Sequence, residues 1–237
     1  MHHGVSGRPI GCPEDCVEAN MSFDWGDQTV ATHYRSDFAE RLGVETSSIV
    51  LPRQVHGSDV LVVARRGHDR PFLGQADGLV TAQWDVALGI LVADCIPIFL
   101  LDRATPAIGL VHAGWRGTVA GIAAKALGVM QDECDTKPEN CIVWIGPSIG
   151  VCCFEVGPEV TAEFQNAFPR NGIEFGDHID LKQVNRQILL SKGVPDDQIE
   201  ISPECSYCSD GFFSHRRAVH RGLERTGRMM GLLALRR

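Results

Sequence analysis

The sequence lacks three features, each of which is typical of a different large class of proteins. No uninterrupted apolar run approaches membrane-spanning length, and the opening segment MHHGVSGRPIGCPEDC lacks the apolar stretch of a signal peptide. No block of basic residues is present, and 22 Lys and Arg against 30 Asp and Glu give a formal net charge of −8. Membrane insertion, secretion and electrostatic binding of nucleic acid are therefore not expected, and we predict a cytoplasmic location.

Internal repeats, low-complexity tracts and Gly/Ser-rich linkers are also absent from the sequence. Of the 237 residues, 44% are hydrophobic and 22% are charged, which is the composition of a globular protein and not of a disordered one. A chain of this length can bury one large core. We therefore expect one catalytic domain over residues 1–237.

Short apolar segments typical of strands occur throughout the chain. Strands are expected at residues 48–52, 59–64, 77–81, 106–112 and 141–146, with strand-like segments at 211–217 and 227–235. The long apolar run VALGILVADCIPIFLLD should form two buried strands that meet at residues 93–95. One continuous helix is disfavoured there, because the run contains Pro97 and several β-branched residues.

Helical spacing is present in four further segments. These are residues 32–43, residues 119–134 with Thr118 as the capping residue, residues 158–168 and residues 180–193. Pro158 suits a first helical turn, and Asp180 and Gly193 suit helix caps. Because strands and helices are mixed without strict βαβ alternation, we predict an α+β fold, a single domain with mixed β-sheets flanked by helices, and not a Rossmann-type fold.

Three polar residues interrupt apolar segments where strands are expected to end: His56 in QVHG, Cys95 in VADC and His112 in LVHAGWRG. One thiolate and two imidazoles can form a three-ligand zinc site with an open fourth position. The same side chains could instead serve as a cysteine nucleophile, a histidine base and a second histidine that orients it. A third interpretation is that all three are ordinary core residues. The spacing alone does not decide among these alternatives.

The stretch HAGWRGT combines small residues with a fixed positive charge on a tight turn. Gly114 and Gly117 would let the backbone turn sharply and approach a ligand closely. Arg116 offers bidentate geometry for phosphate oxygens, and a helix that begins near Thr118 would present free backbone N–H groups to an anion. The alternative for Arg116 is a structural salt bridge beneath the turn.

Several other polar residues are weaker candidates. Asp94 could fix a ligand histidine or act in proton transfer, or it could make ordinary strand-end hydrogen bonds. Arg53, Arg216 and Arg217 could contact phosphate or substrate, although surface salt bridges are the commoner role of such arginines. Asp77 could bond a ribose hydroxyl or cap a turn.

Nine cysteines are present, and an odd number would leave one unpaired in a secreted protein. In a reducing cytosol, buried thiols or metal ligands are expected more than disulfides. CPEDC at residues 12–16 and CSYC at residues 205–208 together have the ligand number of a structural Cys₄ zinc site, but spacing alone cannot show that they meet. Cys152 and Cys153 cannot both face one pocket if the backbone is extended there, so buried packing is expected for at least one of them.

Seven motifs follow one another in order from about Arg53 to the C-terminus: QVHG, ADGLVT, ADCIPIFLLD, VHAGWRGTVAGI, IGPSIGVCCFEVG, FFSHRR and TGRMMGLL. Together they resemble the successive motifs of the YfiH-like, laccase-domain family, and the combination of HAGWRG with ADC is highly specific for it. The N-terminal segment departs from the family pattern. HGVSGR has Gly7 where the family has threonine, and only Gly11 remains of the Gly-Gly turn that follows.

The resemblance implies a purine nucleoside phosphorylase, in a family that was earlier described as multicopper polyphenol oxidases. It implies phosphorolysis of adenosine, inosine, guanosine and methylthioadenosine, with adenosine deamination alongside. It further implies that His56, Cys95 and His112 are the catalytic residues and bind zinc, with copper as the alternative metal. The expected partners are then purine nucleosides and phosphate, and the oligomeric state stays open.

Three other functions remain compatible with the same residues. A cysteine hydrolase would use Cys95 and His112 as nucleophile and base and would be indifferent to chelators. A copper polyphenol oxidase would need several copper ions, and the sequence lacks the His-rich paired motifs that such clusters require. A non-enzymatic zinc-binding module would have closed coordination and no turnover.

Overall fold

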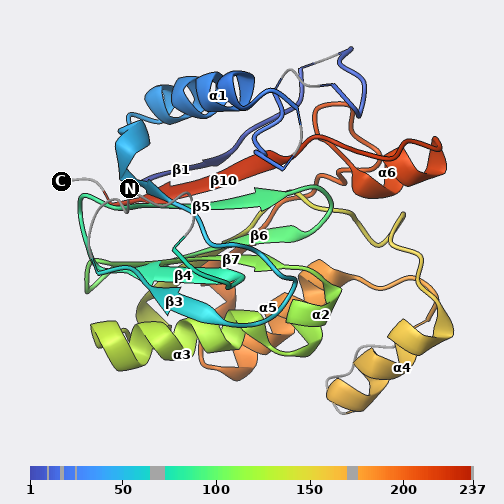
Figure 1. Cartoon of the computed structure of the whole chain (residues 1–237). Coiled ribbons are helices and arrows are strands. Elements are labelled where there is room, and N and C mark those ends of the chain that lie inside the picture. Colours follow the sequence, from blue (N-terminus) through green and yellow to red (C-terminus); the bar gives the residue numbers. More distant parts are fainter. Residues whose placement is uncertain (10, 17–18, 25, 65–72, 170–175, 236–237) are drawn as a thin grey trace.

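Two β-sheets pack face to face at the centre of the computed structural model, with helices on both outer faces (Figure 1). The structure describes residues 1–9, 11–16, 19–24, 26–64, 73–169 and 176–235. Helix α1 lies over the four-stranded sheet, and helices α3 and α5 lie over the six-stranded sheet. The α+β fold with mixed sheets flanked by helices is therefore confirmed. In the part of the chain that is described, no helix has the length and apolarity needed to cross a membrane.

The four-stranded sheet has the order β1-β10-β5-β2. Its strands are β1 (His2–Val5), β10 (Met229–Ala234), β5 (Ala87–Val92) and β2 (Ile49–Val50). Strands β1, β10 and β5 pair antiparallel, whereas β2 pairs parallel to β5. The sequence analysis missed β1, whose pairing with a strand at the other end of the chain is invisible in local patterns.

The six-stranded sheet has the order β3-β4-β7-β6-β8-β9. Its strands are β3 (Val60–Val62), β4 (Gly78–Thr81), β7 (Ala107–Ala113), β6 (Ile96–Asp102), β8 (Cys141–Ile145) and β9 (Ile199–Ile201). The outer pairs β3–β4 and β8–β9 are parallel and the inner pairs are antiparallel. The 3-10 turns η1 (Thr46–Ser48), η2 (Pro138–Asn140) and η3 (Asp196–Gln198) lead directly into β2, β8 and β9.

The apolar run predicted to form two strands does so, and its two halves belong to different sheets. Strand β5 lies in the four-stranded sheet and β6 in the six-stranded sheet, so residues 93–95 cross from one to the other. The crossing requires a sharp turn, and Asp94 makes it with a φ of 81°. Cys95 is thereby placed at the common edge of both sheets.

The helices are α1 (Gln28–Arg41), α2 (Trp115–Val119), α3 (Ile122–Cys134), α4 (Pro158–Ala167), α5 (Leu181–Ser191) and α6 (His215–His220). Asp180 caps α5 by accepting a hydrogen bond from the N–H of Gln183 at 3.0 Å, and Gly193 follows that helix with a φ of 91°. Pro158 occupies the first turn of α4. Helix α1 begins four residues earlier than expected, because Asp27 caps it by accepting from Thr29 at 2.7 Å.

Two details of the predicted elements are wrong, although most of the helix expected at residues 119–134 is present as α3. Thr118 does not begin a helix: it lies inside the five-residue α2, which starts after Gly114, and the chain breaks again at Gly121 (φ 72°) before α3. Residues 215–220 form helix α6 and not a strand, because the Ser214 side chain accepts a hydrogen bond from the Arg217 N–H at 3.1 Å and caps that helix.

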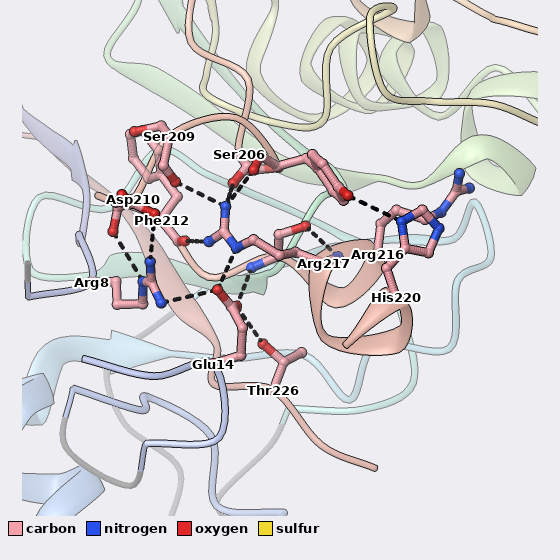
Figure 2. Close-up of polar contacts among 12 residues, drawn as sticks. Arg8, Glu14, Ser206, Ser209, Asp210, Phe212, Arg216, Arg217, His220 and Thr226 are labelled. Carbon is pink, nitrogen blue, oxygen red and sulfur yellow. Dashed lines mark hydrogen bonds and ion pairs between the residues drawn. The ribbon is translucent and has the colours of Figure 1, made fainter. Parts of the chain in front are cut away.

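A buried ion-pair network fixes the segment that precedes α6 (Figure 2). Glu14 is fully buried, and its Oε1 accepts from Arg217 Nε at 2.5 Å and from Arg8 Nη1 at 3.0 Å. Arg217 also donates to the backbone carbonyls of residues 206, 207, 209 and 212. Its donors are therefore committed inside the protein, so the candidate role of Arg217 in phosphate binding is wrong.

Candidate active site

Two loops and one strand bring His56, Cys95 and His112 together at one end of the two sheets. His56 lies between β2 and β3, Cys95 ends the β5–β6 crossing, and His112 lies near the end of β7. One ligand atom from each lies within 4.8 Å of the others. The two imidazole rings meet edge to face, with centroids 4.8 Å apart. His112 is buried, Cys95 is half-buried and His56 is exposed, so the group has one open side.

Two residues at the site have a left-handed backbone conformation, which residues other than glycine rarely adopt. His56 has a φ of 58° and Asp94 has a φ of 81°. Each such residue costs about 1–3 kcal/mol and persists only where its surroundings hold it in place. Asp94 is held through its carboxylate, which accepts from Ser206 Oγ at 2.6 Å and from the Arg216 N–H at 2.7 Å. The turn that carries Cys95 is therefore tied to the segment around α6.

Asp77 is the residue that positions both histidines. This carboxylate is fully buried and lies 2.8 Å from His112 Nδ1. It also accepts the backbone N–H groups of Val55, His56 and Gly57 at 3.2, 3.0 and 2.7 Å. Burial favours the neutral carboxyl, but the hydrogen bonds from His112 and the backbone outweigh it and lower the pKa of Asp77. His112 Nδ1 therefore donates to Asp77, which leaves Nε2 for the site.

Asp94 was one candidate for fixing a ligand histidine, with ordinary strand-end hydrogen bonds as the alternative, and in the structure Asp77 is the carboxylate that contacts His112. The Asp94 carboxylate is occupied by Ser206 and the backbone of Arg216. Asp77 directly precedes β4, which neighbours the strand that carries His112, and the Asp77 carbonyl accepts the His112 N–H at 2.7 Å. Pairing of these two strands brings Asp77 to His112, and this pairing cannot be read from either segment alone.

The glycines of HAGWRGT are required by close packing. A Cβ on Gly114 would lie 3.2 Å from Cys95 Sγ and 3.4 Å from the His56 ring. A Cβ on Gly117 would lie 2.8 Å from the carbonyl oxygen of Gly57, a distance that real Cβ atoms do not adopt. Neither glycine has a positive φ. They allow the turn and α2 to pack directly against the loop of His56. A sharp turn that only glycine could make, as proposed from the sequence, is therefore not the reason why glycine occupies these positions.

In the absence of metal, the surroundings of Cys95 and His112 favour a thiolate on the cysteine and an imidazolium on the histidine. Burial alone would raise the pKa of Cys95, but His112 and His56 outweigh it and lower that pKa to about 6. Burial would likewise lower the pKa of His112, but the Cys95 thiolate and Asp77 outweigh it and raise that pKa to about 9. The thiolate form is the one that acts as a nucleophile or binds a metal.

The pH dependence of Cys95 alkylation tests this pair in chelator-treated protein. The thiolate is present above its lowered pKa, so the rate of reaction with iodoacetamide should rise with pH and reach half its maximum near pH 6. Burial and the charges of Glu133, Asp135 and Asp102 raise the pKa of Cys134, so the alkylation rate of this cysteine should rise at a higher pH than that of Cys95. Peptide mass spectrometry resolves the two sites in one sample. A Cys95 profile that coincides with that of Cys134 would contradict the pair.

A cavity of about 730 Å³ opens directly onto the three side chains. This volume is within the range of small-molecule sites. Four arginines line the cavity: Arg53, Arg116, Arg216 and Arg228. Such a concentration of fixed positive charge favours an anionic ligand. The first three were candidates from the sequence, and Arg228 was not, since it lies in an otherwise apolar terminal motif.

The arginines differ in how firmly they are held. Arg116 is exposed and stacks on Trp115, with 4.3 Å from its guanidinium carbon to the ring centre, and no ion pair joins it to any residue in the described ranges. Arg216 is anchored by its backbone on Asp94 and donates to the Cys153 carbonyl at 3.4 Å. Arg228 is half-buried and donates to the carbonyls of residues 226 and 227.

The fully buried Thr118 hydroxyl accepts from the Asn185 side chain at 2.9 Å, so it is part of the packing and not of the cavity. The short helix α2 begins instead after Gly114, and its first residues, Trp115 and Arg116, line the cavity together with Gly114.

The fold and the site together define a class: two packed mixed sheets, with an open His–Cys–His group at their common edge beneath an arginine-lined cavity. Comparison with known proteins gives the family. Residues 2–236 match the family described as multi-copper polyphenol oxidoreductase laccase. The chain belongs to this family, so the resemblance to the YfiH-like, laccase-domain family is confirmed.

Three similar proteins illustrate the match. Purine nucleoside phosphorylase YlmD of Geobacillus stearothermophilus is 36% identical, over 99% of this chain and 88% of its own length. Adenosine deaminase RL5, from an unknown prokaryotic organism, is 36% identical over 81% of this chain and 79% of its own. The crystal structure of Geobacillus stearothermophilus YlmD superposes with a TM-score of 0.88 at 34% identity, covering 99% of this chain and 92% of that one. The names of the relatives support an enzyme of purine metabolism.

Proposed function

We propose that the chain is a zinc-dependent purine nucleoside phosphorylase that also deaminates adenosine. The observation that carries the proposal is the His56–Cys95–His112 group at the floor of an arginine-lined cavity, in a chain similar to named phosphorylases over almost its full length. The substrates would be adenosine, inosine, guanosine and methylthioadenosine, with phosphate as co-substrate.

The donor set fits a catalytic metal. One thiolate and two imidazoles are ligands that zinc accepts, and ligand atoms within 4.8 Å of one another need only small shifts to share one ion. His112 is fixed by Asp77 in the manner that metal-bound histidines require. The exposed side at His56 leaves a coordination position open to the cavity. When bound, zinc would supply Lewis-acid activation of a water for attack on C6 of adenine.

Phosphorolysis requires the chain to hold phosphate against the ribose. In this reaction a phosphate oxygen bonds to C1′ while the C1′–N9 bond breaks and its electron pair leaves with the purine. Arg116, Arg53 and Arg216 are the cavity cations available to orient the phosphate dianion. Arg228 adds positive charge on the same side as Cys95.

One incubation tests the proposal. The purified protein is mixed with adenosine in the presence and absence of phosphate, and the products are separated by chromatography. We expect adenine and ribose 1-phosphate only with phosphate, and inosine under both conditions. Absence of adenine in the presence of phosphate, with a folded and metal-loaded protein, would reject the phosphorylase assignment.

A cysteine-dependent hydrolase is the second candidate function. The arrangement of Cys95 next to His112, with Asp77 bonded to the far side of that imidazole, favours it. A lowered thiol pKa, a neighbouring imidazole and a carboxylate behind that imidazole are the parts of a nucleophilic triad. Chelators separate the two functions, because a hydrolase of this kind would keep its activity after metal removal, whereas the zinc-dependent enzyme would lose it and regain it with zinc.

Replacing Asp77 with asparagine should lower kcat/KM for adenosine phosphorolysis by about 10- to 100-fold, which is the usual cost of losing the partner of a metal-binding histidine. Asp102→Asn is the matched control. Asp102 is also buried, and it accepts from the backbone of residues 104 and 105 and from the Thr105 hydroxyl, far from the candidate site in the fold. We expect both variants to melt earlier and only Asp77→Asn to lose activity. Equal activity losses would make Asp77 a purely structural residue.

A further inference from the structure

A second group of metal-ligating side chains lies outside the candidate active site. Cys152 and Cys153 follow β8 in a turn, and Cys205 and Cys208 lie between β9 and α6. All four sulfur atoms lie within 4.8 Å of one another. The N–H groups of Cys153 and Phe154 both donate to the Gly150 carbonyl, at 3.0 and 2.9 Å. This turn brings both adjacent cysteines into one group, which an extended backbone would not allow.

The distances between the sulfur atoms suit ligands that share one ion. Cys208 Sγ lies 3.3 Å from Cys153 Sγ and 3.9 Å from Cys152 Sγ. A disulfide requires about 2.05 Å. Four sulfurs at about 2.3 Å from one tetrahedral ion lie about 3.8 Å apart. The observed values are therefore those of a metal–thiolate group.

We propose that Cys152, Cys153, Cys205 and Cys208 form a structural zinc site, independent of the site at Cys95. Four thiolates with no open position are the ligand set of structural zinc. The Cys₄ combination considered from the sequence is wrong, because Cys12 and Cys16 form a disulfide with each other. Thiols or metal ligands were expected more than disulfides, and this pair departs from that expectation, with Cα atoms 6.0 Å apart on one turn.

The backbone around Cys205 is arranged to stabilise a metal-bound sulfur. The Gly150 N–H donates to Cys205 Sγ at 3.2 Å. A Cβ on Gly150 would lie 3.3 Å from Cys152 Sγ and 3.3 Å from the Cys205 Cβ, so glycine lets the two turns approach. Outer hydrogen bonds of this kind are the usual support of metal ligands.

A buried cation lies beside the cluster. Lys182 is buried on α5, and its ammonium donates to the carbonyls of Ser202 and Glu204 at 2.7 and 2.6 Å, directly before Cys205. Four thiolates on one Zn²⁺ carry a net charge of −2, which a neighbouring ammonium partly offsets.

The ion would join two turns that also build the candidate active site. Ser206, between two of the cysteines, donates to the Asp94 carboxylate at 2.6 Å, and the Cys153 carbonyl accepts from Arg216 at 3.4 Å. Phe154 and Arg216 line the cavity. A zinc ion held by both turns would thereby fix the wall of the cavity without contacting substrate.

Cobalt substitution distinguishes this site from the one at Cys95, whatever the enzymatic activity. The metal is removed by chelation, and the protein is titrated with Co²⁺ and followed by visible absorption. We expect the intense bands of tetrahedral four-thiolate cobalt in the wild-type protein and in Cys95→Ala, and their loss in Cys205→Ser. Cys134→Ser, which removes a cysteine outside both groups, should match the wild type.

Native mass spectrometry of the purified wild-type and Cys95→Ala proteins covers the case in which Cys205→Ser does not fold. One zinc ion should remain bound to Cys95→Ala. The proposal is overturned if no four-thiolate spectrum develops in the wild-type protein, if Cys95→Ala retains no zinc, or if peptide mapping finds a disulfide among the four cysteines.

Discussion

Cys95→Ala is expected to lose both adenosine phosphorolysis and adenosine deamination, by more than about 100-fold, while it stays folded. Loss of an outer partner of a metal-binding residue costs about 10- to 100-fold, and removal of a direct ligand should cost more. Cys95 is the one thiolate in the candidate ligand set, beside two imidazoles. Removal of one small side chain should lower the free energy of unfolding by only about 1–3 kcal/mol.

The measurement is kcat/KM for both reactions, with circular dichroism melting and zinc content on the same preparations. Cys134→Ala is the matched control, since it also removes one half-buried thiol but lies at the end of α3. A soluble Cys95→Ala protein that melts cooperatively and turns over at the wild-type rate would remove Cys95 from the active site. Loss of deamination alone would instead confine the metal's role to activation of water.

Local patterns were sufficient for the fold class and for the break inside the long apolar run. Pro97 and the β-branched residues indicate two strands, and residues 93–95 do form the turn between them. Local patterns could not show that the two strands belong to different sheets, because strand pairing depends on contacts between distant segments. For the same reason β1, which pairs with β10 at the other end of the chain, was not predicted.

The errors in predicted helices come from capping. Ser214 precedes a short segment that reads as a strand, and its side chain instead starts a helix by accepting from Arg217. Thr118 has the residue type of a helix cap, but burial beside Asn185 gives its hydroxyl a tertiary partner. In both cases the side chain has a hydrogen-bond partner that the local pattern did not indicate, and for Thr118 this partner lies on a distant helix.

The three residues of the candidate site share a local context that the sequence displays, namely a polar side chain where an apolar strand ends. The structure brings them together. The residues that support them have no such signal: Asp77 depends on the pairing of β4 with β7, and Arg228 on the position of β10. The four-cysteine group was missed because the turn at Gly150, which aligns Cys152 with Cys153, depends on hydrogen bonds that the sequence does not reveal.

Arg116→Ala should impair phosphorolysis selectively. A bidentate charged contact to phosphate that is made in the transition state is worth roughly 2–4 kcal/mol, which corresponds to about 30- to 1,000-fold in rate. Deamination needs no phosphate, so its rate should change much less. Arg116 is exposed and stacks on Trp115, and the described residues provide no carboxylate partner for it, so the melting temperature should stay close to that of the wild type.

The test compares phosphorolysis at several phosphate concentrations with phosphate-independent deamination, and Arg41→Ala serves as the matched control. Arg41 is also an exposed arginine. Within the described residues its ion-pair partner is Asp37 on the same helix, α1, which lies on the opposite side of the fold from α2. We expect Arg116→Ala to show a raised KM for phosphate or a lowered kcat of phosphorolysis, and Arg41→Ala to show neither. If both reactions of Arg116→Ala fall equally and the protein melts earlier, Arg116 stabilises the turn and phosphate binds elsewhere in the cavity, with Arg53 and Arg216 as the next arginines to replace.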